Sequence, residues 1–137
     1  MDSTARYRMA RPRIAVIGPG ALGTYYAARL TLAGAPTILL DYRLERAMRV
    51  NESGIRLHTP QGERHVEVPV TADPDNLAAI DAAIVLVKAY HTETVAATLA
   101  KYLPQHSVAL TLQNGLGNVE TLQLHLGQNR VFGGATV

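Results

Sequence analysis

Three glycines near the start of the chain have a spacing that can bind a phosphate. Gly18, Gly20 and Gly23 form a G-x-G-x-x-G turn directly after the apolar run 14–17. In such a turn the first glycine lets the chain leave a strand, the second lets the backbone approach a pyrophosphate, and the third allows close helix packing. A helix that begins here presents free N–H groups and its positive dipole end to an anion. The pattern predicts a site for the diphosphate of a nucleotide cofactor, formed by Gly18, Pro19, Gly20, Ala21, Leu22 and Gly23.

The residues after the turn favour binding over the alternative, in which such glycines only let a helix pack closely on a strand. Apolar side chains recur at helical spacing up to residue 33, Gly34 then ends the helix, and a second apolar run follows at 37–40. This order is typical of a β-α-β unit. No Lys-Ser or Lys-Thr pair follows Gly23, which argues against the P-loop of nucleoside-triphosphate hydrolases.

Polar residues stand where three further predicted strands end. Asp41 follows the apolar run 37–40, Lys88 follows 82–87, and Asn114 follows 107–112. Because the carboxyl ends of parallel strands meet at one edge of a sheet, we expect these side chains to lie near the glycine turn. Ligands of open α/β sheets bind in the crevice outside that edge. The sequence therefore predicts one binding crevice built from four separate segments.

Asp41 and Arg43 bear on which dinucleotide would bind. Asp41 lies twenty-three residues after Gly18, about where an acidic side chain accepts hydrogen bonds from the adenosine ribose of NAD. Arg43 would instead pair with the 2′-phosphate of NADP. In the structural alternative, Asp41 caps the next helix and Arg43 is a solvated surface charge. Both cofactors stay open on these residues alone.

The segments around Lys88 and Asn114 carry groups suited to a substrate. An ammonium at the mouth of the crevice would act as a point charge or a proton donor, although a strand-end lysine can also extend into water. Gln113, Asn114 and Gly115 offer amide groups that would hold a hydroxyl, carboxylate or carboxamide, although a plain turn has a similar composition. We predict Lys88 and Asn114 as catalytic residues, and Lys88, Gln113, Asn114 and Gly115 as cofactor-binding residues.

The order of elements predicts an α/β fold of the Rossmann type, with a doubly wound, mostly parallel sheet and helices on both faces. A hairpin with strands at 55–59 and 65–68 interrupts this order, and a cap at Asp73 precedes a short helix at 77–80. The other predicted strands are 14–17, 37–40, 82–87, 107–112 and 131–137, and the other predicted helices are the one after the glycine turn, 43–51, 92–102 and 117–126.

Length and composition set the remaining limits. The chain has 137 residues, 47% hydrophobic and 18% charged, which fits one folded domain. We expect a flexible basic arm at 1–12 and the domain at 13–137. A net charge of +2 predicts no nucleic-acid partner, and the lack of a long apolar stretch predicts no membrane partner and a cytoplasmic location. With no cysteine, redox chemistry would require a cofactor.

Two further expectations concern assembly and metals. The chain stops within an apolar segment, so we expect it to be the first part of a longer protein, and an exposed edge strand there leaves a homodimer open. The five histidines lack the spacing of metal ligands and are interpreted as structural or exposed, so no metal site is predicted.

Several of these segments together resemble the ketopantoate reductase (2-dehydropantoate 2-reductase) family over nearly the whole chain from Arg13. The resemblance implies an N-terminal Rossmann domain that binds NADPH, with the glycine turn on the diphosphate and Arg43 on the 2′-phosphate. It also implies that Lys88 and Asn114 face cofactor and substrate, and that a helical second domain, absent from this chain, supplies a lysine as the principal acid. The segments that carry it are 18–23, Arg43, 54–57, 87–92 and 112–117.

The function expected from this resemblance is hydride transfer from NADPH to a small 2-oxo acid, most specifically 2-dehydropantoate. Asp41 departs from that expectation because its charge would repel a 2′-phosphate, so NAD stays open. Two rival functions use the same glycine turn: a non-catalytic NAD(P)-binding sensor, and another Rossmann dehydrogenase that acts on a different hydroxy acid.

Overall fold

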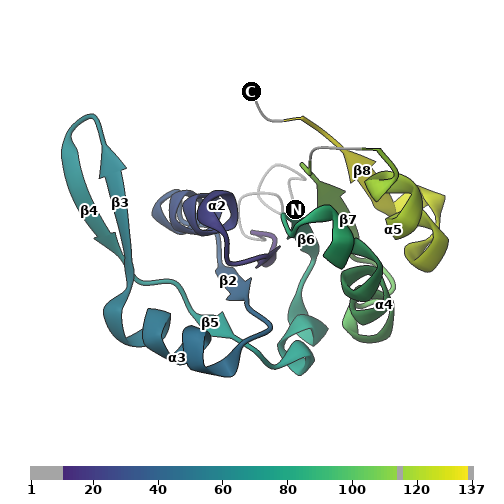
Figure 1. The fold of residues 1–137 in the computed structure, drawn as a ribbon, viewed down its shortest axis with the longest axis horizontal. Coiled ribbons are helices and arrows are strands. Elements are labelled where there is room, and N and C mark those ends of the chain that lie inside the picture. The colour runs from purple at the N-terminus through teal and green to yellow at the C-terminus, as the bar shows by residue number, and fades with distance from the viewer. Residues whose placement is uncertain (1–10, 114–115, 136–137) are drawn as a thin grey trace, which may run out of the picture.

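A six-stranded parallel sheet forms the centre of the domain. The computed structural model describes residues 11–113 and 116–135, and its sheet has the order β5-β2-β1-β6-β7-β8, in which every neighbouring pair is parallel (Figure 1). Its strands are β1 (Ile14–Ile17), β2 (Thr37–Leu40), β5 (Val70–Thr71), β6 (Ala82–Val85), β7 (Val108–Thr111) and β8 (Val131–Gly133). The predicted fold class is confirmed, and the sheet is wholly parallel.

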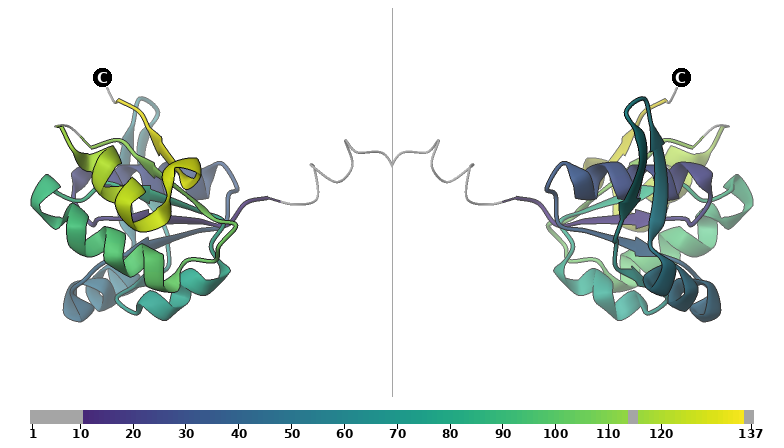
Figure 2. Two further views of the ribbon diagram at one scale, coloured as in Figure 1. Left: turned by 90° about the vertical axis from the view of Figure 1, so that its right-hand side faces the viewer. Right: turned by 90° about the vertical axis from the view of Figure 1, so that its left-hand side faces the viewer.

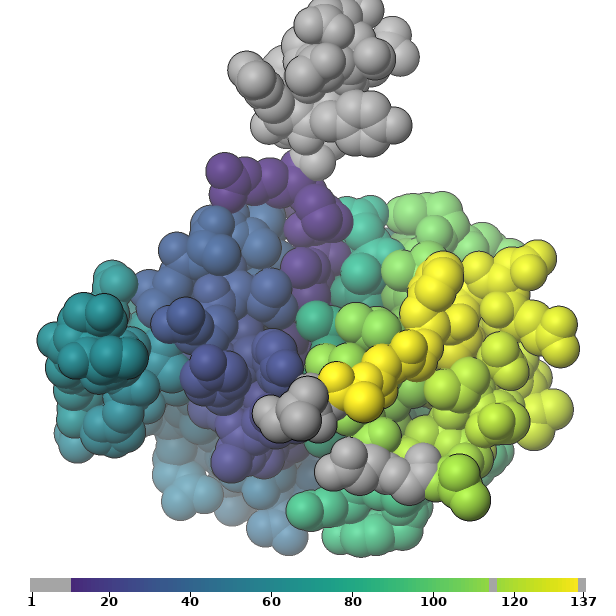
Figure 3. Space-filling view, turned by 90° about the horizontal axis from the view of Figure 1, so that it is seen from above, coloured from purple at the N-terminus to yellow at the C-terminus, as the bar shows by residue number. Residues whose placement is uncertain are grey.

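Helices cover both faces of this sheet. The helices α2 (Ala21–Leu32) and α3 (Leu44–Ser53) lie on one face, and α4 (Thr92–Tyr102) and α5 (Asn118–Leu126) lie on the other (Figure 1). The described residues also form the 3₁₀ segments η1 (Pro74–Ala79), η2 (Ala89–His91) and η3 (Gln128–Arg130). Seen from above, the α5–β8 segment lies on the opposite side of the molecule from the hairpin of β3 (Ile55–Thr59) and β4 (Gly62–Val66), with α2 between them (Figure 3).

Alternating side chains of β1 supply both cores. Ala15 and Ile17 pack with buried residues of α4 and α5, whereas Val16 packs with residues of α2 and with Leu39 of β2. All three β1 side chains are buried, which is why the strand reads as a continuous apolar run. Because both cores hold β1, the strand fixes the position of the glycine turn that follows it at the edge of the sheet.

The hairpin β3 (Ile55–Thr59) and β4 (Gly62–Val66) is a separate antiparallel pair. Figure 2 shows it lying across the outer side of α2, against which its buried residues Ile55, Leu57 and Val66 pack. The hairpin is confirmed, but its second strand starts at Gly62 instead of His65, because Thr59 pairs directly with Gly62 around a two-residue turn.

The predicted strands at the carboxyl edge are too long. β6 ends at Val85 and β7 at Thr111, because their neighbour β1 ends at Ile17 and turns away at Gly18. β8 ends at Gly133, opposite Thr111, while residues 136–137 lie outside the described part. Residues beyond these ends, including Leu86 and Val87, are thereby released into loops at the edge where ligands bind.

The described start of the chain is attached to the domain. The Arg11 guanidinium donates a hydrogen bond to the Gly34 carbonyl at 2.9 Å, and the Arg13 N–H donates to the Asp81 carboxylate at 2.8 Å. Residues 1–10 of the predicted arm lie outside the described residues. Within the described part, no helix is long and apolar enough to span a membrane, and no group of three or more potential metal ligands forms.

Candidate nucleotide-binding site

The three glycines of the turn differ in what surrounds them. A Cβ at Gly18, where φ is +121°, would come within 2.8 Å of the Leu86 carbonyl group, and a Cβ at Gly23 would overlap the Gly18 carbonyl oxygen. A Cβ at Gly20 would meet no heavy atom within 4 Å. The first and third glycines are thus required by packing, whereas the second keeps space open for a group outside the chain.

The N-terminus of α2 points its unpaired donors into that space. The first helical hydrogen bond runs from the Thr24 N–H to the Gly20 carbonyl at 2.9 Å, so the N–H groups of the three preceding residues have no acceptor within the helix. No side chain caps this end, and its first turn holds no acidic residue. These donors and the helix dipole favour an anion here.

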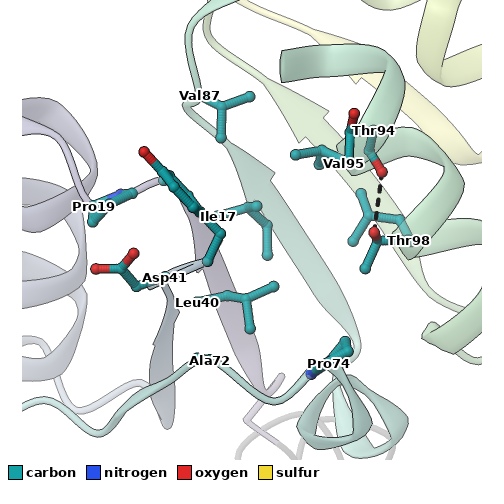
Figure 4. Close-up of a pocket in the computed structure, with 13 residues that line it drawn as sticks. Ile17, Pro19, Leu40, Asp41, Ala72, Pro74, Val87, Thr94, Val95 and Thr98 are labelled. Atoms are coloured by element: carbon teal, nitrogen blue, oxygen red, sulfur yellow. Dashed lines mark hydrogen bonds between the residues drawn. The ribbon is translucent and has the colours of Figure 1, made fainter. Parts of the chain in front are cut away.

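Two adjoining cavities lie at this edge. The larger, of about 540 Å³, is enclosed by the glycine turn, the loop after β6 and the loop after β7, and both Arg46 and Lys88 line it. The smaller, of about 220 Å³, is mainly apolar and lies between the ends of β1 and β2 and helix α4. Figure 4 shows its walls, among them Ile17, Leu40, Val87 and Val95. A cavity lined in part by charged side chains, beside a mainly apolar one, suits a molecule with a charged centre and a flat apolar end.

Asp41 is held at the end of β2 by two arginines. Its carboxylate is fully buried and accepts hydrogen bonds from the Arg43 N–H at 2.9 Å and from the Arg46 guanidinium at 2.5 and 2.8 Å. Burial raises the pKa of this carboxyl group, but the bonds from Arg46 and Arg43 outweigh it, and the pKa lies below its usual value. Asp41 is therefore ionised and paired, and it holds the N–H of Arg43, the residue directly before α3, although no described side chain caps that helix. Its predicted contact with a ribose stays a prediction.

Tyr42 brings the two arginines together beside the larger cavity. Its ring is 64% exposed and lies 5.7 Å from the Arg43 guanidinium and 5.2 Å from that of Arg46. The His91 ring, which belongs to the segment after β6 on the other side of the cavity, lies 5.6 Å from the Tyr42 ring. Arg43 itself is exposed at the N-cap of α3 and makes no side-chain ion pair within the described residues. Its charge is available to an anion.

A buried hydrogen-bond network fixes the opposite wall. The Gln113 side-chain amide donates to the Val87 carbonyl at 2.7 Å and to the Thr92 hydroxyl at 2.9 Å, and its oxygen accepts from Thr111 at 2.8 Å. The Thr92 hydroxyl donates in turn to the Asn118 side-chain oxygen at 2.9 Å. These bonds join the loops after β6 and β7 to the starts of α4 and α5. The side chain of Gln113 connects protein groups and the residue also lines the cavity, so its predicted contact with a cofactor stays a prediction.

Lys88 directly follows this network. It is exposed, lines the larger cavity opposite the glycine turn, and forms no ion pair with any described residue. Its backbone is held by the His91 N–H, which donates to the Lys88 carbonyl at 2.8 Å. Lys88 thus places a positive charge at the larger cavity from a backbone that is held in position.

The structure brings most of the predicted site residues together. Gly23 lies beneath the turn, Arg43 lies beside Tyr42, and Asn114 and Gly115 lie outside the described residues. The sequence argument did not find Tyr42, Arg46 or Tyr90, and it set His91 aside as structural or exposed. Tyr90 and His91 lie within the segment 87–92 that carries the family resemblance, and the signal for Tyr42 and Arg46 was their position in the segment after β2. The predicted residues that line the two cavities are Gly18, Pro19, Gly20, Ala21, Leu22, Asp41, Lys88 and Gln113.

This sheet order, with a glycine turn at the switch between its halves, defines a Rossmann-type nucleotide-binding domain. Residues 14–137 match the family described as ketopantoate reductase PanE/ApbA, and the chain belongs to that family of NAD(P)-dependent oxidoreductases.

Individual relatives agree with this assignment. The chain is 37% identical over 125 residues to the 2-dehydropantoate 2-reductase of Halobacterium salinarum, a match that covers 90% of this chain and 41% of the relative. The crystal structure of a PanE/ApbA family ketopantoate reductase from Ralstonia eutropha JMP134 superimposes with a TM-score of 0.79 at 30% identity, covering 91% of this chain and 41% of that one. A D-mandelate dehydrogenase solved with NADH and anilino(oxo)acetate shares the fold, with a TM-score of 0.79 at 21% identity over 90% of this chain and 40% of that one. The chain thus spans about two fifths of the length of these proteins.

Proposed function

We propose that this chain is the NADPH-binding part of a reductase that converts a 2-oxo acid, most specifically 2-dehydropantoate, into the 2-hydroxy acid. The observation that carries the proposal is the larger cavity, which places the open N-terminus of α2 at Gly20 opposite the unpaired ammonium of Lys88. Relatives named 2-dehydropantoate 2-reductase support the substrate class.

The described residues fit the parts of NADPH. The N–H groups at the start of α2 suit the diphosphate, and the space above Gly20 admits it. The apolar walls of the smaller cavity suit the adenine ring. The exposed guanidinium of Arg43, beside the Tyr42 ring, suits the 2′-phosphate. The Asp41 carboxylate is already paired, which favours NADPH over NADH at this position.

In the proposed reaction the bound cofactor supplies a hydride from its nicotinamide C4 to the ketone carbon. Lys88 stabilises the negative charge that develops on the ketone oxygen as the carbon–oxygen double bond opens. The network around Gln113 keeps the Lys88 backbone in place. Asn114 is proposed to bind the same substrate. As the family resemblance implies, the proton for the final hydroxyl comes from a lysine outside these 137 residues.

The full-length protein that carries this chain tests the proposal directly. Oxidation of NADPH is followed at fixed pH with a panel of 2-oxo acids that includes 2-dehydropantoate. We expect kcat for the preferred acid to fall about 100-fold or more in Lys88→Ala, as when one donor to a developing oxyanion is removed. Lys101→Ala, which removes an exposed lysine of α4, is the matched control and leaves kcat unchanged.

Two outcomes would contradict this function. Tight NADPH binding with no oxidation by any 2-oxo acid would favour the sensor function. Oxidation with a different hydroxy or oxo acid alone would favour another dehydrogenase. For residues 1–137 by themselves, we expect cofactor binding without efficient turnover.

A further inference from the structure

We propose that the Asp41–Arg46 ion pair sets the cofactor selectivity of this domain: Arg46 keeps the Asp41 carboxylate away from the ribose and so permits a 2′-phosphate to bind. The inference rests on the proposed binding of NADPH at this edge. It concerns two residues of this chain whose side chains meet between β2 and α3.

An acidic residue at the end of the second strand ordinarily favours NAD. Its carboxylate accepts hydrogen bonds from the ribose hydroxyls and repels the phosphate that distinguishes NADP. Asp41 stands at that position, yet its side chain is fully buried and holds three hydrogen bonds from protein groups. Both carboxylate oxygens already have donors and the side chain is buried, so a ribose would meet a carboxylate that is paired with protein groups and withdrawn from the surface.

Arg46 is well placed to hold this carboxylate. Its Nε and Nη2 atoms each donate to a different oxygen of Asp41, which is the two-point geometry that arginine makes and lysine does not. Its guanidinium also lies 5.2 Å from the Tyr42 ring, and its side chain is 31% exposed at the wall of the larger cavity. Contacts on two sides limit the rotamers that Arg46 can adopt.

The charge balance follows from this pairing. As a unit, the Asp41–Arg46 pair is neutral, so it does not oppose an anion beside Tyr42. Arg43 donates its backbone N–H to Asp41 and its positive charge also acts on that carboxylate, while its guanidinium forms no ion pair with a described residue and is available to a 2′-phosphate. Loss of the Arg46 guanidinium would leave the Asp41 charge facing the same phosphate.

The test is a calorimetric titration of the chain with NADPH and with NADH at one ionic strength. In Arg46→Ala we expect NADPH affinity to fall about tenfold or more, while NADH affinity is unchanged or higher, because the carboxylate is freed for the ribose. In the double variant Asp41→Asn with Arg46→Ala, NADPH affinity recovers, since the repelling charge is gone. Arg49→Ala, an exposed arginine of α3 that makes no contact with Asp41, is the matched control and changes neither affinity.

Two results would overturn the inference. An equal loss of NADPH and NADH affinity in Arg46→Ala would assign Arg46 a structural role. A double variant that binds NADPH no better than Arg46→Ala would make Arg46 a direct phosphate ligand. A wild-type chain that binds neither cofactor would instead refute the proposed function on which the inference rests.

Removing one partner of a buried ion pair lowers the free energy of unfolding, and this loss could prevent Arg46→Ala from folding. In that case Asp41→Asn alone still tests the inference. The amide oxygen still accepts a hydrogen bond from Arg46, whereas the NH2 group cannot accept the second one, and the side chain carries no charge. We expect NADH affinity within about threefold of the wild type and NADPH affinity equal or higher. A large drop in NADH affinity would show that Asp41 binds the ribose directly and would contradict the proposed pairing role. Circular dichroism of each variant confirms that the fold is intact.

Discussion

The two walls of the larger cavity are built in opposite ways. The wall formed by the glycine turn and the loop after β2 presents backbone N–H groups, with open space above Gly20 and the exposed guanidinium of Arg43 beside it. The wall formed by the loops after β6 and β7 is closed from within by the buried bonds among Gln113, Thr92 and Asn118. Lys88 is the charged group on that second wall.

This difference separates binding from positioning. In the described residues of the first wall, the N–H donors at the start of α2 have no acceptor within the helix, and the Arg43 guanidinium forms no ion pair. These groups are therefore available to an anion. In the second wall, the polar side chains of Gln113, Thr92 and Asn118 form hydrogen bonds with one another. These bonds keep the Lys88 backbone at a fixed distance from the first wall. Changes to the unpaired donors of the first wall should therefore alter affinity, and changes to the packed or hydrogen-bonded groups of either wall should alter stability.

The largest effect is expected from Gly23→Ala on the first wall. The added methyl group would overlap the Gly18 carbonyl oxygen, which belongs to the backbone and has no flexible side chain to move aside. We expect a loss of about 3 kcal/mol in the free energy of unfolding, measured by urea denaturation. Gly20→Ala is the matched control, and its stability should stay within about 0.5 kcal/mol of the wild type because no atom lies within 4 Å. Equal losses in the two variants would contradict the separate roles of these glycines.

On the second wall, Thr92→Val should cost about 1 to 3 kcal/mol of unfolding free energy, because it removes the hydrogen bond that the Thr92 hydroxyl accepts from Gln113 and the one it donates to Asn118. The hydroxyl is replaced by a methyl group of similar size, so packing is retained. Thr98→Val on the same helix is the control, since its hydroxyl bonds only to the Thr94 carbonyl of its own helix. If both substitutions cost the same, the network does not stabilise this wall.

A smaller effect is expected from pH. The pKa of Asp41 is lowered in the folded domain, so its contribution to stability is present above the unfolded pKa of about 4 and is lost as pH falls through the folded value. Unfolding free energy should therefore decrease as pH drops below about 4, and less steeply in Asp41→Asn. Urea denaturation at a series of pH values measures both slopes.

Asp81 gives the comparison for this pH effect. The Arg13 N–H and His106 lower its pKa as well, but this carboxylate lies far from the cavity and is partly exposed. We expect Asp81→Asn to change the acid slope less than Asp41→Asn does. The reverse order would contradict the importance of the buried Asp41–Arg46 pair.

The sequence predicted the first wall better than the second. The glycine turn, the flanking strand and the helix after it are local patterns, and each residue type has one geometric reason. β5 was missed because Val70–Thr71 is only two residues long and has no pattern of its own. The strands β6 and β7 were predicted too long because the end of a strand depends on where its neighbour turns away.

The sequence also did not predict which side chains pair with one another in the folded domain. Asp41 was predicted as a ribose acceptor from its distance to Gly18, and nothing in that spacing indicates that Arg46 binds both of its oxygens. Gln113 was identified as part of the site, but its bond to the Val87 carbonyl joins segments twenty-six positions apart. Such contacts arise from the packed fold and not from local sequence.

The central claim is that the open N-terminus of α2 binds the diphosphate of a dinucleotide. Calorimetric titration with NADPH and NADH tests it most directly. The titrated proteins are the wild-type chain and the variants Gly20→Asp, Arg43→Ala and Ala97→Asp. We predict that Gly20→Asp abolishes binding of both cofactors, because a carboxylate then occupies the space above the turn. Arg43→Ala should weaken NADPH alone, and Ala97→Asp, which adds the same charge on an exposed position of α4, should change neither affinity. Unchanged binding in a folded Gly20→Asp variant would contradict the claim and reduce the glycine turn to a packing element.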